Sequence, residues 1–161
     1  MDKTENQLKY ENYREQFKRL KTALNNGFNL EAMFIEYAIT EDRTESILRH
    51  AGKWEAYLKS RKGREPNIDS KIKYIQKLAE QKKTLANRYF SDDLLDRVLV
   101  WKEDRNRLIH ALLKQQLKHE EVKSLAAQGK ILADMLRNRA GSFNRAADRK
   151  NAKEKNNEQH V

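Results

Sequence analysis

Trp101-Lys-Glu-Asp-Arg-Asn-Arg-Leu-Ile-His110 is the stretch that decides the fold, and it continues an apolar run that begins near Leu94. Apolar residues recur along this segment at the spacing of one face of a buried amphipathic helix, at Leu94, Val98, Trp101, Leu108 and Leu112. Arg105 stands in the middle of the longest gap, where the pattern requires a core residue. A guanidinium on a packing face is unfavourable unless it is paired, hydrated or part of a site. Arg105 is therefore the best functional clue in the chain.

The composition predicts an all-α protein. The chain has 161 residues, of which 38% are hydrophobic and 36% are charged, and it contains one proline and five glycines. Helix breakers are therefore rare, and runs of β-branched residues are absent. We expect an antiparallel helical bundle of about five helices, with a moderate core and hydrated outer faces.

The charge balance points to an anionic partner. The formal net charge is +10 and the isoelectric point is about 9.7, which favours nucleic acid or an anionic surface, although solubility alone would also account for it. The absence of cysteine excludes disulfides, thiolate catalysis and Cys-based zinc sites. No apolar run is long enough to span a bilayer, and the polar N-terminus is unlike a secretory signal. We expect a cytoplasmic protein without membrane partners.

The hydrophobic periodicity divides the chain into helices and a tail. Helices are predicted over the segments 4–25, 29–51, 68–88, 94–116 and 119–139, with a short helical turn near Trp54 and a basic loop over 59–66. The second of these either runs through the polar stretch 40–45 or restarts at Thr40. Gly141 is expected to stop the last helix. The predicted organisation is a bundle over residues 1–140, followed by a mobile basic tail over residues 141–161.

The histidines predict no metal site. His50, His110, His119 and His160 do not have the spacing of a ligand cluster, and we expect neither a metal nor another cofactor. His50 lies on one helix face with Arg43, two turns away. That pair could contribute to a site, but the pattern is more typical of surface residues.

The chemistry of the central motif suits a phosphate. Arg105 is permanently charged and can bind phosphate oxygens with its planar fork. His110 can give or take a proton near neutral pH, and Asn106 lies one turn before it. Because Arg105 and His110 are about 140° apart around a helix axis, one helix presents them poorly to one ligand. Two copies related by a two-fold axis would pool two of each in one cleft.

The run Arg105-Asn-Arg-Leu-Ile-His110, placed late in a small helical protein, resembles the Arg-polar-x-x-x-His motif of the HEPN superfamily. This superfamily comprises small all-helical domains of many prokaryotic toxin and defence ribonucleases. The resemblance implies a HEPN-like fold and a homodimer with a composite, metal-independent active site. It also implies that Arg105 and His110 are catalytic and that Asn106 orients the site.

We therefore expect a metal-independent endoribonuclease of a toxin-antitoxin or antiviral defence system, with a cognate antitoxin protein as a further expected partner. The 2′-hydroxyl of RNA would attack the adjacent phosphate, with His110 in proton transfer and Arg105 on the phosphate. The predicted RNA contacts are Lys102, Arg107 and Lys114. One alternative is a non-catalytic helical module that binds RNA or a protein. Another is a purely structural bundle in which Arg105 pairs with a carboxylate such as Glu41 or Asp104.

Overall fold

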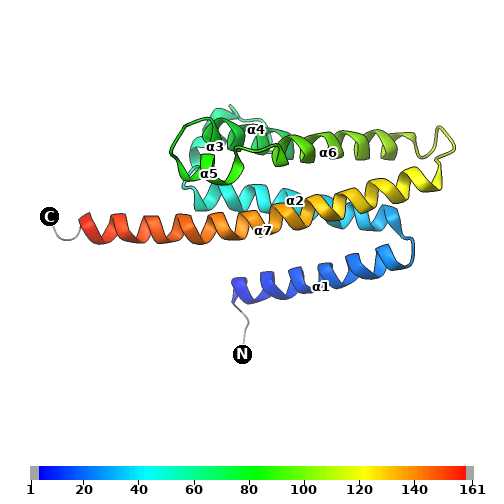
Figure 1. The fold of residues 1–161 in the computed structure, drawn as a ribbon, viewed down its shortest axis with the longest axis horizontal. Coiled ribbons are helices and arrows are strands. Elements are labelled where there is room, and N and C mark those ends of the chain that lie inside the picture. The colour runs from blue at the N-terminus through cyan, green and yellow to red at the C-terminus, as the bar shows by residue number, and fades with distance from the viewer. Residues whose placement is uncertain (1–3, 159–161) are drawn as a thin grey trace. The chain divides into compact units, whose positions relative to one another are not determined.

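The computed structural model describes residues 4–158, and within them the protein is entirely helical (Figure 1). The seven helices of this range are α1 (Glu5–Asn25), α2 (Asn29–His50), α3 (Trp54–Ser60), α4 (Ile68–Ala79), α5 (Leu85–Phe90), α6 (Leu94–Ala111) and α7 (His119–Glu158). The prediction of an all-α protein is confirmed. The predicted number of about five helices is too low.

Several helix ends follow from local sequence. Thr4 caps α1 and Asn67 caps α4, each through a reciprocal capping box with the residue three positions later. After α2, Gly52 takes a φ of 64°, a left-handed conformation that glycine adopts without strain. These are short-range effects, which explains why the first two helices were predicted to within a residue or two.

The predicted helix over residues 68–88 is wrong, because the structure breaks it into α4 and α5. The Thr84 hydroxyl oxygen accepts a hydrogen bond from the Asn87 backbone N–H (3.1 Å) and so caps α5. The Asn87 side chain donates to the carbonyl of Ala79 (2.7 Å), which satisfies a backbone acceptor at the end of α4. The two polar side chains thus stabilise a turn where the apolar periodicity alone suggested continuity. The next helix, α6, also ends earlier than predicted, at Ala111 rather than near residue 116.

The predicted helix stop at Gly141 is also wrong. Helix α7 runs through this glycine to Glu158, and the segment expected to be a mobile tail is helical over that range. Phe143 and Ala147 are buried, with 2% and 4% of their surface exposed. A phenylalanine and an alanine at i and i+4 form one apolar face, and this packing outweighs the weak helix-breaking tendency of one glycine. Residues 159–161, including His160, lie outside the described residues.

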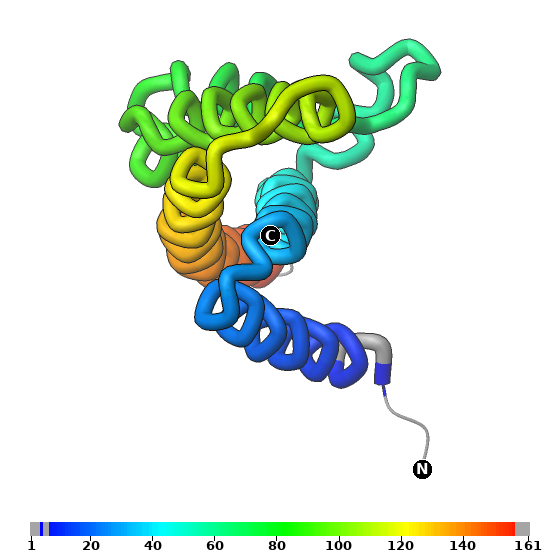
Figure 2. Tube along the Cα trace, turned by 90° about the vertical axis from the view of Figure 1, so that its right-hand side faces the viewer, coloured from blue at the N-terminus to red at the C-terminus, as the bar shows by residue number. Residues whose placement is uncertain are grey.

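The chain separates into two compact units. The first contains the residues up to Ala38 together with Trp101–Ile131, and the second contains Ile39–Val100 together with the residues from Leu132 onward. Helices α2, α6 and α7 each contribute residues to both units, as can be followed along the coloured tube in Figure 2.

In the first unit, α7 packs closely against side chains of α2 and α6 at Trp101 and Gly129. Trp101 is 1% exposed, and its indole N–H donates to the carbonyl of Leu125 in α7 (3.0 Å). A β-carbon placed on Gly129 would lie 2.6 Å from the Trp101 ring and would also collide with a carboxylate oxygen of Glu36. The glycine therefore allows α7 to approach the side chains of α2 and α6 closely.

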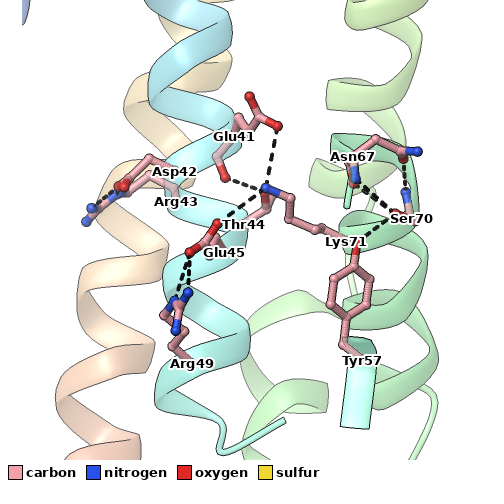
Figure 3. Close-up of polar contacts among 10 residues, drawn as sticks. All are labelled: Glu41, Asp42, Arg43, Thr44, Glu45, Arg49, Tyr57, Asn67, Ser70 and Lys71. Atoms are coloured by element: carbon pink, nitrogen blue, oxygen red, sulfur yellow. Dashed lines mark hydrogen bonds and ion pairs between the residues drawn. The ribbon is translucent and has the colours of Figure 1, made fainter. Parts of the chain in front are cut away.

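The second unit contains a buried lysine held by carboxylates. Lys71 of α4 is 3% exposed, and its ammonium lies 3.5 Å from a carboxylate oxygen of Glu41 and 3.6 Å from one of Glu45, both on α2 (Figure 3). Glu45 also accepts a hydrogen bond from Arg49 (2.8 Å). Each charge in this group has an opposite charge beside it, so the buried ammonium is compensated.

Candidate functional site

Arg105 occupies a core position of α6. Only 8% of its surface is exposed, and Leu94, Val98 and Trp101 on the same helix face are at most 1% exposed. The prediction that an arginine takes the place of a core residue is confirmed. Leu108 is half-buried and Leu112 is exposed, so the apolar face weakens toward the end of the helix.

Two aromatic rings of α2 hold the Arg105 guanidinium. Its central carbon lies 4.5 Å from the ring centroid of Tyr37 and 5.0 Å from that of Phe34. Both distances are within the range of cation–π attraction. One terminal nitrogen donates to the side-chain carbonyl of Asn106 (3.0 Å), while Nε is buried and has no hydrogen-bond partner among the described residues. The guanidinium is oriented mainly by ring faces and one neutral amide.

Burial and a nearby carboxylate act on Arg105 in opposite directions. Burial lowers the pKa of the guanidinium, whereas Tyr37 and the negative charge of Glu36 raise it. Glu36 is fully buried on α2. The carboxylate whose charge acts on the Arg105 pKa is therefore Glu36, and neither of the two suggested by the sequence. Asp104 pairs with Arg107 instead, and Glu41 pairs with Lys71.

Glu36, Phe34 and Tyr37 were missed as site residues. The sequence does hold a signal for Glu36, because this glutamate lies three positions after the buried Met33 and four before the buried Thr40. That spacing places a carboxylate on the buried side of an amphipathic helix, as Arg105 places a guanidinium. Two opposite charges on two apolar faces indicate a shared buried site.

His110 lies on the exposed flank of α6. Its side chain is exposed and Asn106 is half-buried. Asn106 and His110 are separated by about 40° around the helix axis, whereas Arg105 and His110 are separated by about 140°. Asn106 therefore contacts Arg105 and lies on the same side of the helix as His110, but one protomer does not present Arg105 and His110 on one surface.

The predicted RNA contacts differ in exposure. Lys102 is 5% exposed and lies 2.7 Å from a carboxylate oxygen of Glu103, so this side chain does not present its charge at the surface. Arg107 is exposed and pairs with Asp104, and Lys114 is exposed. Arg107 and Lys114 are the members of the predicted set that a polyanion could reach.

A pocket of about 580 Å³ in the first unit lies beside the motif without including it. Its lining comes from the end of α6, the following loop and the first turns of α7, and contains Asp104, Arg107, Leu108, Glu120 and Glu121 among others. Arg105, Asn106 and His110 do not line it. Three carboxylates against one arginine would repel a phosphate, so this pocket is unsuited to nucleic acid.

Two kinds of feature are absent from the described residues, a cluster of metal ligands and a membrane-spanning helix. Within residues 4–158 there is no group of three or more His, Asp or Glu side chains that could hold a metal ion. The same part of the chain has no helix that combines the length and apolar character needed to cross a bilayer.

Comparison with known proteins places the chain in no family: no family model, curated protein or solved structure matches it.

Proposed function

We propose that the protein is a metal-independent endoribonuclease of the HEPN class that acts in a toxin-antitoxin or antiviral defence system. The observation that carries this proposal is the placement of Arg105 on the packing face of α6 at 8% exposure, with His110 exposed later on the same helix. Removing a cation from water costs on the order of several kcal/mol. A site that needs a fixed guanidinium explains why Arg105 is retained at a buried position.

The environment of Arg105 suits phosphate binding. Its Nη1 donates to the Asn106 side chain, and its Nε is buried without a hydrogen-bond partner among the described residues, so only the terminal nitrogens could reach a ligand. A neutral amide and two ring faces orient the guanidinium without consuming its charge in a close ion pair. A guanidinium held in this way is suited to stabilise charge that develops on a phosphoryl group.

The proposed site is composite. Because Arg105 and His110 point about 140° apart on one helix, the proposal requires a second copy of the chain to complete a cleft. Phe34 lies over Arg105 and is 57% exposed, and Leu113 is fully exposed. Both belong to the first unit and provide apolar surface for contact with another chain.

The proposed reaction accounts for every proton and bond without a metal ion. One His110 takes the proton from the 2′-hydroxyl, whose oxygen attacks the adjacent phosphorus. The bond from phosphorus to the 5′-oxygen breaks, and the His110 of the other copy gives a proton to that leaving oxygen. The products are a 2′,3′-cyclic phosphate and a 5′-hydroxyl, and DNA is spared because it lacks the attacking group.

The test is a cleavage assay on total RNA in the presence of EDTA. We expect wild-type protein to cut RNA and to leave cyclic or 3′-phosphate ends, and His110→Ala to lower the rate by about 100-fold or more. His119→Ala is the matched control, because this histidine is also exposed and lies outside the motif. Full activity of the His110→Ala variant would refute the proposal.

A second candidate function is a non-catalytic module that binds RNA or a protein partner, and the small exposure of Arg105 favours it. This candidate predicts salt-sensitive RNA binding, because the chain carries a net charge of +10. It also predicts the same binding by wild type and His110→Ala, with no turnover in either. Measuring binding and cleavage on the same samples separates the two functions.

A further inference from the structure

We propose that the second unit contains a binding site for a small organic anion with a short apolar chain, built around the pair His50 and Asp148. The site lies in the second unit, whereas Arg105, Asn106 and His110 belong to the first. It is thus independent of the proposed nuclease activity. The sequence pattern of His50 is typical of a surface residue, and its short distance to Asp148 is visible only in the folded chain.

Asp148 fixes the His50 ring. The His50 Nδ1 lies 2.8 Å from a carboxylate oxygen of Asp148, although the residues are 98 positions apart in sequence. Because a carboxylate accepts hydrogen bonds, Nδ1 carries the proton and donates it. The remaining ring nitrogen, Nε2, is then available to a ligand, as an acceptor in the neutral ring or as a donor in the charged ring.

The pair has little value for stability. The His50 side chain is 37% exposed and that of Asp148 is 59% exposed. Ion pairs that are this exposed to solvent are weak. An oriented imidazole at the edge of a cavity is better explained by what the cavity binds.

The cavity beside His50 has the right size and lining for a small amphipathic ligand. Its volume is about 260 Å³, slightly below the range of about 300–1,000 Å³ that is typical for drug-sized ligands. Leu78, Leu85 and Phe143 provide an apolar wall. A short hydrocarbon chain would lose water against this wall on binding.

The charges of the lining select an anion. Lys53 and Lys150 line the cavity together with His50, and none of the described lining residues carries a carboxylate. Lys150 lies 3.7 Å from Glu154, but both side chains are at least 60% exposed, so this pair is weak. The two lysines therefore supply the positive charge of the site, since Asp148 offsets a charge on His50, and the leucines and Phe143 supply its apolar side.

The test is an NMR titration of the full-length chain with butyrate, following the ring signals of the four histidines and identifying those of His50 with His50→Gln. We expect saturable shifts of the His50 signals in the millimolar range, because so small a ligand has few contacts to offer. Butylamine should cause no such shift, and inorganic phosphate should bind more weakly than butyrate.

Two variants complete the experiment. Lys53→Gln should weaken butyrate binding by about two- to fivefold, as expected for one exposed charge, whereas His119→Gln should leave it unchanged. Absence of saturable His50 shifts in the folded wild-type protein would overturn the proposal. Equal binding of butylamine would overturn the selection for an anion, and equal binding of phosphate would overturn the role of the apolar wall.

Discussion

Lys71 in the second unit and Arg105 in the first are both buried cations, and their surroundings differ. Lys71 in the second unit lies between the carboxylates of Glu41 and Glu45, so its charge is balanced and a structural role explains it. Arg105 in the first unit lies against two aromatic rings and one amide, with Glu36 as its nearby negative charge. The comparison teaches that burial alone does not mark a functional cation.

The largest expected effect is a loss of stability in the Arg105→Ala variant. This change removes a positive charge that acts on the fully buried Glu36 and opens space between Phe34 and Tyr37. We expect the free energy of unfolding to fall by about 3–5 kcal/mol, measured by urea denaturation.

Lys71→Met is the matched variant in the second unit. Its partner carboxylates are 41% and 34% exposed and can be hydrated by solvent. We expect a loss of only about 1 kcal/mol. Equal losses in the two variants would remove the distinction between the two buried cations.

Arg105→Lys tests the function of the same site. Lysine keeps the charge but lacks the planar fork, so we expect RNA cleavage to fall by about 100-fold, equivalent to about 2.7 kcal/mol. Lys71→Arg should leave the cleavage rate within about twofold of wild type. A cleavage assay that found Arg105→Lys fully active would argue against a role of the fork in catalysis.

Gly129→Ala tests how closely α7 packs against its neighbours in the first unit. The added β-carbon would meet the Trp101 ring and Glu36, and neither buried group has room to move. Overpacking should exceed the gain in helix propensity, so we expect a net destabilisation of about 1–3 kcal/mol. The measurement is thermal unfolding, and a rise in Tm would contradict the close approach of α7.

Gly141→Ala is the corresponding change in the second unit, on the same helix. Here the added β-carbon would lie 3.5 Å from the guanidinium of Arg145, which is ordinary contact with a flexible side chain. Alanine favours a helix interior, so we expect stabilisation by about 0.5–1 kcal/mol. A loss of stability in the same unfolding assay would mean that α7 is interrupted at this position.

The smallest expected effect concerns acid stability in the second unit. Arg139 hydrogen-bonds to Asp92 and lowers the pKa of that carboxyl from 3.8. Since the folded-state pKa is depressed, the stabilisation is present above about pH 3.8 and is lost as the pH falls through the lower folded value.

The Asp92 side chain is 48% exposed. Its ion pair with Arg139 therefore contributes only about a few tenths of a kcal/mol to stability. Arg139→Met should make the unfolding free energy less dependent on pH below 3.8, while Arg149→Met on the exposed surface should not. An unchanged pH dependence in Arg139→Met would show that Asp92 is held by its backbone contacts instead.

Prediction from sequence succeeded where short-range effects dominate. The ends of α1 and α2 follow from capping residues and glycines within a few positions of each other. The break between α4 and α5 was not predicted, because Asn87 reaches back eight residues to Ala79 and apolar periodicity carries no sign of that hydrogen bond. The continuation of α7 through Gly141 was missed for a related reason, since it depends on the burial of Phe143.

The candidate site, too, could be predicted only in part from the sequence. The anomaly at Arg105 was visible in the sequence, because one charged residue interrupts a regular apolar face. The roles of Arg105, Asn106 and His110 in RNA cleavage, and the HEPN-like fold and homodimer, stay predictions. Glu36 and the two rings of α2 became part of the site only through the folded structure.

The sequence by itself determined an all-helical chain, a strong positive charge and the position of Arg105 on a packing face, because periodicity and composition act within one helix. Only the tertiary structure decided which groups surround that guanidinium and that His50 meets Asp148 across 98 positions. Contacts between distant segments depend on how helices pack, and the spacing of residues along one helix does not encode them.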